Sequence, residues 1–152
     1  MSLVSHHYKI IAADSGKCLM LPSATGTVTA KHYTGATNEQ WNIQVEGTAA
    51  TGPYTIENIG YNDRPLATYS AACSEGDNVV GKQADTEWKI VDNGNITKSI
   101  CILNYAWTVD GSKVRDLSGA GLHLSVYCPD SQVTLFLRDS ADSRQRFTFE
   151  QI

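Results

Sequence analysis

The chain alternates apolar and polar residues in short runs, and one figure returns three times. A polar turn meets a large aromatic residue, and an apolar residue follows two places later: Trp41 with Ile43, Trp88 with Ile90, and Phe147 with Phe149. Period-two alternation places both members of each pair on one face of a strand. Three such strands, each closing a segment, predict one unit used three times.

Short alternating runs separated by Gly, Pro, Asn, Asp and Ser turns predict four strands in each of the first two units. No segment carries a sustained helical period, so an all-β domain is expected. The predicted strands of these units are 8–13, 17–21, 27–33 and one from 41, then 53–58, 65–69, 77–81 and one from 88.

The third unit is longer, because Trp88 and Phe147 are 59 residues apart whereas Trp41 and Trp88 are 47 apart. Its first strand is predicted at 99–104, its third at 132–137 and its fourth from 147. Two runs, 113–117 and 122–126, compete for the second strand, and one of them belongs to an insertion of about a dozen residues.

Bulk properties narrow the classes of function. The 152 residues make one domain, 41% apolar and 18% charged, with a net charge of −4 that argues against nucleic-acid binding. No apolar run is long enough to insert into a membrane. Cys and His do not cluster at metal-ligand spacing, and no cofactor motif is present, so no metal or cofactor is expected.

The cysteines and the first residues bear on the compartment. The chain starts without a basic region followed by an apolar stretch, so we expect a cytoplasmic protein. Its four cysteines form no CxxC pair, and in a reducing cytosol they are expected to be free thiols.

The three aromatic figures resemble the Gln-x-Trp motif of the ricin-B-type lectins. Glu39-Gln40-Trp41, Thr86-Glu87-Trp88 and Gln145-Arg146-Phe147 stand in its three places, and Ser15-Gly16-Lys17-Cys18-Leu19 resembles that family's S-G-K-C-L. The resemblance implies a β-trefoil in a single domain, 1–152, with pseudo-threefold repeats at about 6–50, 51–94 and 95–152. Trp41, Trp88 and Phe147 are then core residues.

A sugar site needs a flat aromatic ring for the C–H face of a sugar and polar groups for its hydroxyls. In ricin-B-type units an Asp follows the Leu of the second strand, an aromatic ends the third strand, and an Asn precedes Q-x-W. Met20 and Ala67 stand at the Asp position of the first two units, and Asp85 and Arg144 stand at the Asn position of the last two. The candidate carbohydrate-binding residues are His32, Tyr33, Gly35 and Asn38 in the first unit and Asp116, Phe136 and Asp139 in the third.

Each candidate also has a structural interpretation. Gly35 suits a turn that needs positive φ, and Asn38 suits a turn bonded to its own backbone. Tyr33 suits a half-buried strand position, and Phe136 suits the core. In the third unit the Asp position is Ser125 or Asp116, depending on which run is the second strand.

The resemblance favours a non-enzymatic, cytoplasmic lectin like those of fungal fruiting bodies, with glycans or glycoproteins as partners, a defensive role and a possible homodimer. The alternative is a fungal-type β-trefoil protease inhibitor, with Arg64 in the loop 61–65 or Lys113 in the loop 110–115 entering a protease pocket. A trefoil that has lost sugar binding is the third possibility, and the residues at Met20 and Ala67 favour it.

Overall fold

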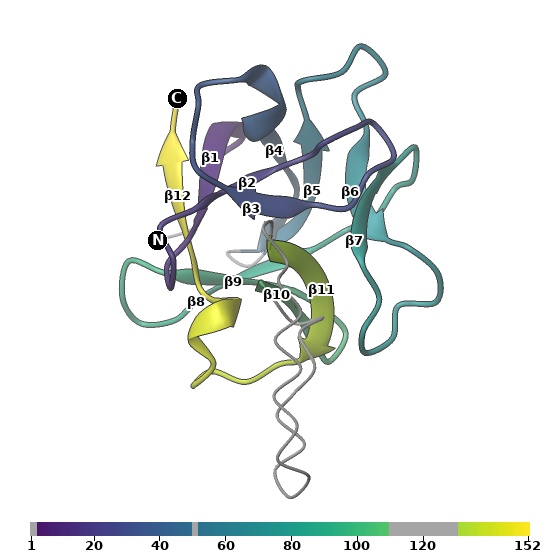
Figure 1. Cartoon of the computed structure of the whole chain (residues 1–152). Helices are drawn as coiled ribbons and strands as arrows, with labels where there is room; N and C mark the ends of the chain where they lie inside the picture. The colour runs from purple at the N-terminus through teal and green to yellow at the C-terminus, as the bar shows by residue number, and fades with distance from the viewer. Residues whose placement is uncertain (1–2, 50–51, 110–130) are drawn as a thin grey trace, which may run out of the picture.

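The structure is a computed structural model, and it describes residues 3–49, 52–109 and 131–152. Figure 1 shows short strands wrapped around a common centre. The elements are β1 (His6–Ala12), β2 (Cys18–Met20), β3 (Thr29–Lys31), η1 (Thr37–Glu39), β4 (Trp41–Ala49), β5 (Gly52–Asn58), β6 (Leu66–Tyr69), β7 (Val79–Lys82), β8 (Lys89–Asp92), β9 (Lys98–Ile102), β10 (Tyr105–Val109), β11 (Ser131–Leu137), η2 (Ser143–Gln145) and β12 (Phe147–Gln151).

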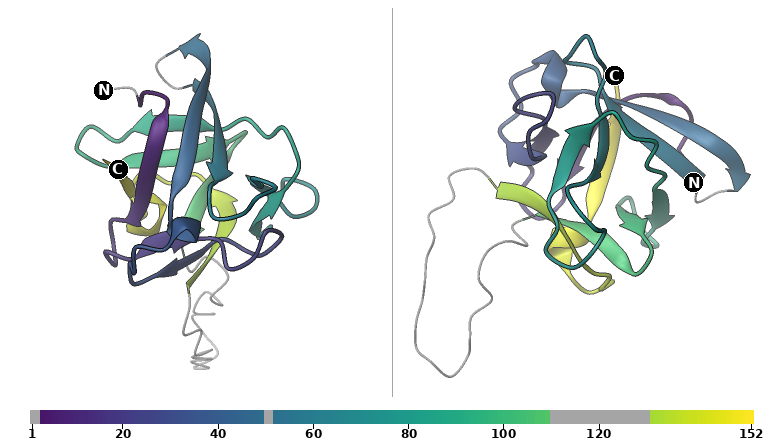
Figure 2. Two further views of the ribbon diagram at one scale, coloured as in Figure 1. Left: turned by 90° about the horizontal axis from the view of Figure 1, so that it is seen from above. Right: turned by 90° about the vertical axis from the view of Figure 1, so that its right-hand side faces the viewer.

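The strands of the described residues form a ring of six and three hairpins. β1, β4, β5, β8, β9 and β12 pair in a closed ring, in which the Tyr54–Trp88 bridge joins β5 to the start of β8. The hairpins β2–β3, β6–β7 and β10–β11 pair internally and contact one another across one end of the ring. A ring of strands leaves few open edges. This is the β-trefoil that the sequence predicts (Figures 1 and 2).

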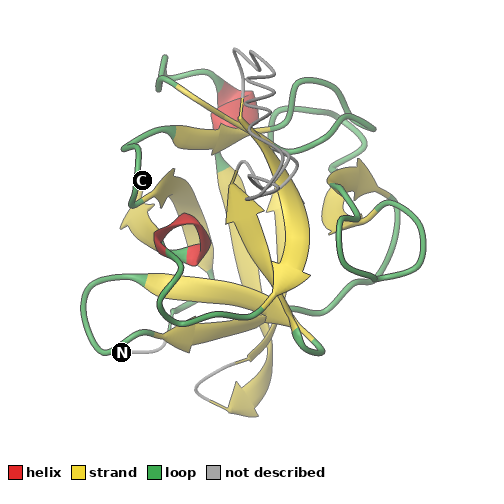
Figure 3. Ribbon diagram, turned by 60° about the horizontal axis from the view of Figure 1, so that its bottom comes forward, coloured by secondary structure: helices red, strands yellow, loops and turns green. Residues whose placement is uncertain are grey.

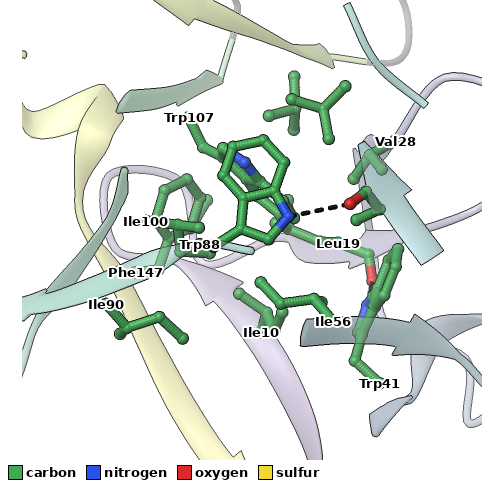
Figure 4. Close-up of a cluster of buried hydrophobic side chains, with 14 of the residues drawn as sticks. Ile10, Leu19, Val28, Trp41, Ile56, Trp88, Ile90, Ile100, Trp107 and Phe147 are labelled. Carbon is green, nitrogen blue, oxygen red and sulfur yellow. Dashed lines mark hydrogen bonds between the residues drawn. The ribbon is translucent and has the colours of Figure 1, made fainter. Parts of the chain in front are cut away.

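The core forms where the three units meet. Trp41, Trp88 and Phe147 are fully buried in one apolar cluster, as predicted (Figure 4). The indole N–H of Trp41 donates to the Leu19 carbonyl at 2.9 Å, and that of Trp88 donates to the Ala67 carbonyl at 2.9 Å. Each tryptophan therefore fixes the fourth strand of its unit to the second.

The second strand of the third unit is β10, and neither predicted run takes its place. β10 pairs with β9 on one side and with β11 on the other, as β6 pairs with β5 and β7. Its residues are aromatic or β-branched at alternate positions, which favours a strand. The prediction was wrong because β10 begins at Tyr105, separated from the end of β9 by only two residues, where the sequence pattern predicts no strand. The runs 113–117 and 122–126 lie outside the described residues.

Helical structure is confined to two single turns, η1 and η2, among the residues that the structure describes (Figure 3). Each precedes the aromatic residue that opens the fourth strand of its unit, β4 or β12. Within those ranges no helix has the length and apolar character to cross a membrane.

Candidate functional site

Four of the predicted site residues lie together in the segment between β3 and β4, residues 32–40, which we call the first-unit loop. His32, Tyr33 and Gly35 are exposed and Asn38 is half-buried. β3 ends at Lys31, so Tyr33 stands beyond the strand that was predicted to contain it. The first-unit loop therefore presents an imidazole and a phenol ring to solvent at one end of β3.

Glu39 holds this loop in place from beneath. Its side chain is buried, and the carboxylate accepts hydrogen bonds from the backbone N–H groups of three consecutive residues. The donors are Thr34 at 3.0 Å, Gly35 at 2.8 Å and Ala36 at 3.0 Å, and the Thr34 hydroxyl adds a fourth bond. Because all four partners are donors, a group with two accepting oxygens fits here. Glu39 stands where the related motif has Gln.

The Asn38 side chain bonds the segment after β2 in its own unit rather than its own backbone. Its Nδ2 donates to the Leu21 carbonyl at 3.2 Å, and the Leu21 N–H donates to the Asn38 carbonyl at 3.0 Å. A Cβ on Gly60 would lie 2.5 Å from the Asn38 Cα, so the second unit also packs closely here. Asn38 thus ties the first-unit loop to the end of β2 and to the β5–β6 turn.

Tyr33 is half exposed, and Lys9 covers part of its ring. The side chain is 46% exposed, and the Lys9 ammonium lies 4.6 Å from the ring centroid. Lys9 also pairs with Glu150 at 2.6 Å, and this hydrogen bond raises the pKa of Lys9. The ring is therefore positioned by a cation on β1, and an exposed part remains for a ligand.

Gly35 adopts the positive φ that its interpretation as a turn residue predicts. Its φ of 89° lies in the left-handed region, and nothing lies within 4 Å of an added Cβ. The backbone conformation therefore favours glycine at this position. Close packing does not, because an added Cβ would meet no neighbouring atom.

The third unit places Phe136 and Asp139 at the end of β11, in another repeat from the first-unit loop. Phe136 is half-buried and pairs with Ala106. Asp139 is exposed, its Oδ1 accepts from the Ala141 N–H at 2.9 Å, and its own N–H donates to Gln145 Oε1 at 2.8 Å. Asp139 therefore shapes its own loop. Asp116, the remaining candidate, lies outside the described residues.

Strand register also corrects the assignment of Ala67 to the position where ricin-B-type units have Asp. Trp88 bonds the Ala67 carbonyl as Trp41 bonds that of Leu19, so the residue that matches Met20 in the second unit is Thr68, not Ala67. In the third unit the matching residue on β10 is Thr108. The sequence concealed this match because the second unit has no leucine at the position of Leu19.

Thr68 and Thr108 are both buried, and both bond the residue at the Gln position of Q-x-W. The hydroxyl of Thr68 bonds the hydroxyl of Thr86, and that of Thr108 accepts from Gln145 Nε2 at 3.1 Å. These positions therefore serve internal bonding in the second and third units, and the first-unit loop is the better candidate site.

The described residues give less support to a metal site or to a protease-inhibitory loop than to a sugar site. Among the described residues, no three His, Cys, Asp or Glu side chains gather as metal ligands would. Arg64, the candidate inhibitory residue, has a φ of 49° and pairs with Glu57 at 3.2 Å, whereas proteases bind extended peptide. Lys113 lies outside the described residues.

Comparison with known proteins bears on the family and the fold. The sequence profile described as "Ricin-type beta-trefoil lectin domain-like" matches residues 2–81, which is more than half of the chain. No curated protein sequence matches the chain.

Solved structures resemble the whole chain. The ricin B-like lectin of Macrolepiota procera, solved with lactose, superimposes with a TM-score of 0.74 at 20% identity over 100% of this chain and 99% of its own. The Rhizoctonia solani agglutinin has a TM-score of 0.77 at 16% identity, covering 100% and 99%. The Polyporus squamosus lectin, bound to a Neu5Aca2-6Galb1-4GlcNAc epitope, has a TM-score of 0.74 at 18% identity, covering 99% of this chain and 50% of its own. At such identities the structures establish the fold, and the matched profile shows that this chain belongs to the ricin-type β-trefoil lectin domain-like family.

Proposed function

We propose that the protein binds carbohydrate through the first-unit loop. The observation that carries the proposal is the half-exposed ring of Tyr33 on a loop whose backbone is fixed by the buried carboxylate of Glu39. A rigid aromatic platform binds a sugar face with little loss of conformational entropy, because the loop is ordered before the ligand arrives.

The polar groups of the loop supply the contacts to hydroxyls. The His32 imidazole is exposed beside Tyr33, and a neutral imidazole offers one donor and one acceptor. Met20, at the position where the family has Asp, brings no carboxylate to the end of β2, so the loop itself must bond the hydroxyls. The structural neighbours solved with lactose and with a sialylated galactose glycan make galactose-containing glycans the first ligands to test.

The test begins with a glycan array, which identifies stronger ligands. The binding of lactose is then measured by calorimetric titration. Tyr33→Ala is expected to lower glycan affinity at least about tenfold, a loss of about 1.4 kcal/mol, because the stacking surface disappears. Tyr33→Phe, which keeps the ring, is expected to retain most of the affinity.

Ile96→Ala is the matched control, because Ile96 is an exposed apolar residue of the β8–β9 turn in another part of the molecule. Thermal unfolding of all three variants shows whether the fold is intact. A Tyr33→Ala protein that is folded and gives the same array signal as the wild type would exclude this loop as the site.

Four further expectations from the sequence form part of the same proposal. They are that the lectin is non-enzymatic and cytoplasmic, that it has a defensive role, and that it forms a homodimer, in which two sites would raise the apparent affinity through avidity. Light scattering gives the molar mass in solution and so tests the homodimer. Toxicity in feeding assays on invertebrates tests the defensive role.

A further inference from the structure

A pocket lies on the outer wall of the strand ring, and none of its lining residues belongs to the first-unit loop. It is a shallow pocket of about 300 Å³ at the start of β1, lined by Ser5, His6, His7, Asn42 and Gln44. His7 pairs with Asn42 in the β1–β4 register, and these two strands lie side by side in Figure 2. Asn42 and Gln44 alternate with the buried Trp41 and Ile43, so their side chains face outward.

The lining combines donors and acceptors that the protein does not fully use. Asn42 Nδ2 donates to Glu57 Oε2 at 2.8 Å, which leaves its Oδ1 as an acceptor. Within the described part of the chain, the Gln44 amide and the His7 ring make no hydrogen bond. The Ser5 Oγ accepts from the Val45 N–H at 3.0 Å and keeps its own proton to donate.

The composition of this lining indicates the class of ligand. None of the five side chains is a carboxylate, an ammonium or a guanidinium. Side-chain amides, a hydroxyl and flat imidazole rings suit an uncharged ligand with many hydroxyl groups rather than an ion.

The pocket continues the surface that begins at Tyr33. Lys9, whose ammonium lies over the Tyr33 ring, and His7 are two residues apart on β1 and therefore share one face. That spacing is about 7 Å along a strand. A ligand that leaves Tyr33 along β1 thus reaches the pocket after passing Lys9.

We infer that this wall pocket is a second subsite, which binds an inner sugar of a neutral oligosaccharide whose terminal sugar contacts Tyr33. The inference rests on the proposed function, and it places the subsite on the wall of the barrel, where none of the predicted sugar residues lies. The protein would then select glycans by length as well as by terminal sugar.

The experiment measures by calorimetry how tightly the full chain binds a short and a long neutral ligand. The short ligand is galactose, and the long one is the tetrasaccharide lacto-N-neotetraose. The wild type is expected to bind the tetrasaccharide at least about tenfold more tightly than galactose. Gln44→Ala and His7→Ala are expected to weaken tetrasaccharide binding about tenfold and to change galactose binding less than about twofold. Gln132→Ala, which removes an exposed strand glutamine of the third unit, is the matched control and should change neither affinity.

The outcomes separate the two proposals. If the pocket variants bind the tetrasaccharide as tightly as the wild type while Tyr33→Ala loses both ligands, the wall subsite is excluded and the first-unit site stands. If the wild type binds neither these ligands nor any glycan on the array, both proposals fall.

Discussion

At the scale of the residue, Glu39 and Gln145 show how one motif position serves two kinds of loop. Glu39 faces only donors, whereas Gln145 accepts from the Asp139 N–H with Oε1 and donates to the Leu137 carbonyl with Nε2. Both side chains are buried, so an unmatched group has no water to bond. The chemistry of each loop therefore decides between carboxylate and amide.

Glu39→Gln is expected to destabilise the protein by about 1–3 kcal/mol, because the new NH₂ group would face backbone N–H donors. The reciprocal change, Gln145→Glu, should also be destabilising, since a carboxylate oxygen would replace the donor to Leu137. Urea unfolding monitored by tryptophan fluorescence measures both changes. A Glu39→Gln protein as stable as the wild type would show that the loop is held by something other than this carboxylate.

At the scale of the element, the fourth strand of the first two units is joined to the second by an indole N–H. Trp41 and Trp88 each donate to a carbonyl on β2 or β6, while Phe147 fills the third position without a donor. Packing is common to all three units, and the added hydrogen bond is particular to the tryptophans.

The two contributions can be separated at Trp41. Trp41→Ala is expected to cost about 3–5 kcal/mol, because it leaves a large cavity among the core residues. Trp41→Phe keeps most of the apolar volume and is expected to cost less than half of that, mainly for the Leu19 carbonyl left without its donor. Denaturant midpoints of the two variants give the comparison, and equal losses would contradict it.

At the scale of the whole molecule, the three units share one core, so the chain should unfold as a single cooperative unit. Cys18, Cys73 and Cys101 are free thiols in the described structure, as expected, and Cys128 lies outside it. Burial raises the pKa of the Cys18 thiol to about 11 and also raises that of Cys101. Reactive thiolate at these sites is therefore scarce in the folded protein.

A protein with Cys73→Ser and Cys128→Ser keeps only these two buried thiols, and their reaction with a disulfide reagent at pH 8 should follow global unfolding. We expect labelling of both at one common rate that rises with urea, as the unfolded population does. Labelling of either thiol at the rate of a free cysteine in native buffer would show local opening of the barrel.

The sequence alone determined the repeat, the strand class and the core. These follow from period-two patterning and from large aromatics, which act through local geometry and hydrophobicity. It also placed Gly35 and Asn38 in the turn before Trp41, whereas His32 and Tyr33, assigned to the predicted strand 27–33, lie beyond the end of β3.

Only the tertiary structure decided which groups those residues contact. The cation over Tyr33 comes from β1, and the bond of Asn38 reaches the residue after β2. The wall pocket joins His7 to Asn42, which is 35 positions further along the chain. The second strand of the third unit was likewise decided by pairing with β9 and β11. Such contacts depend on strand register and on the closure of the ring, which link distant residues and leave no local pattern in the sequence.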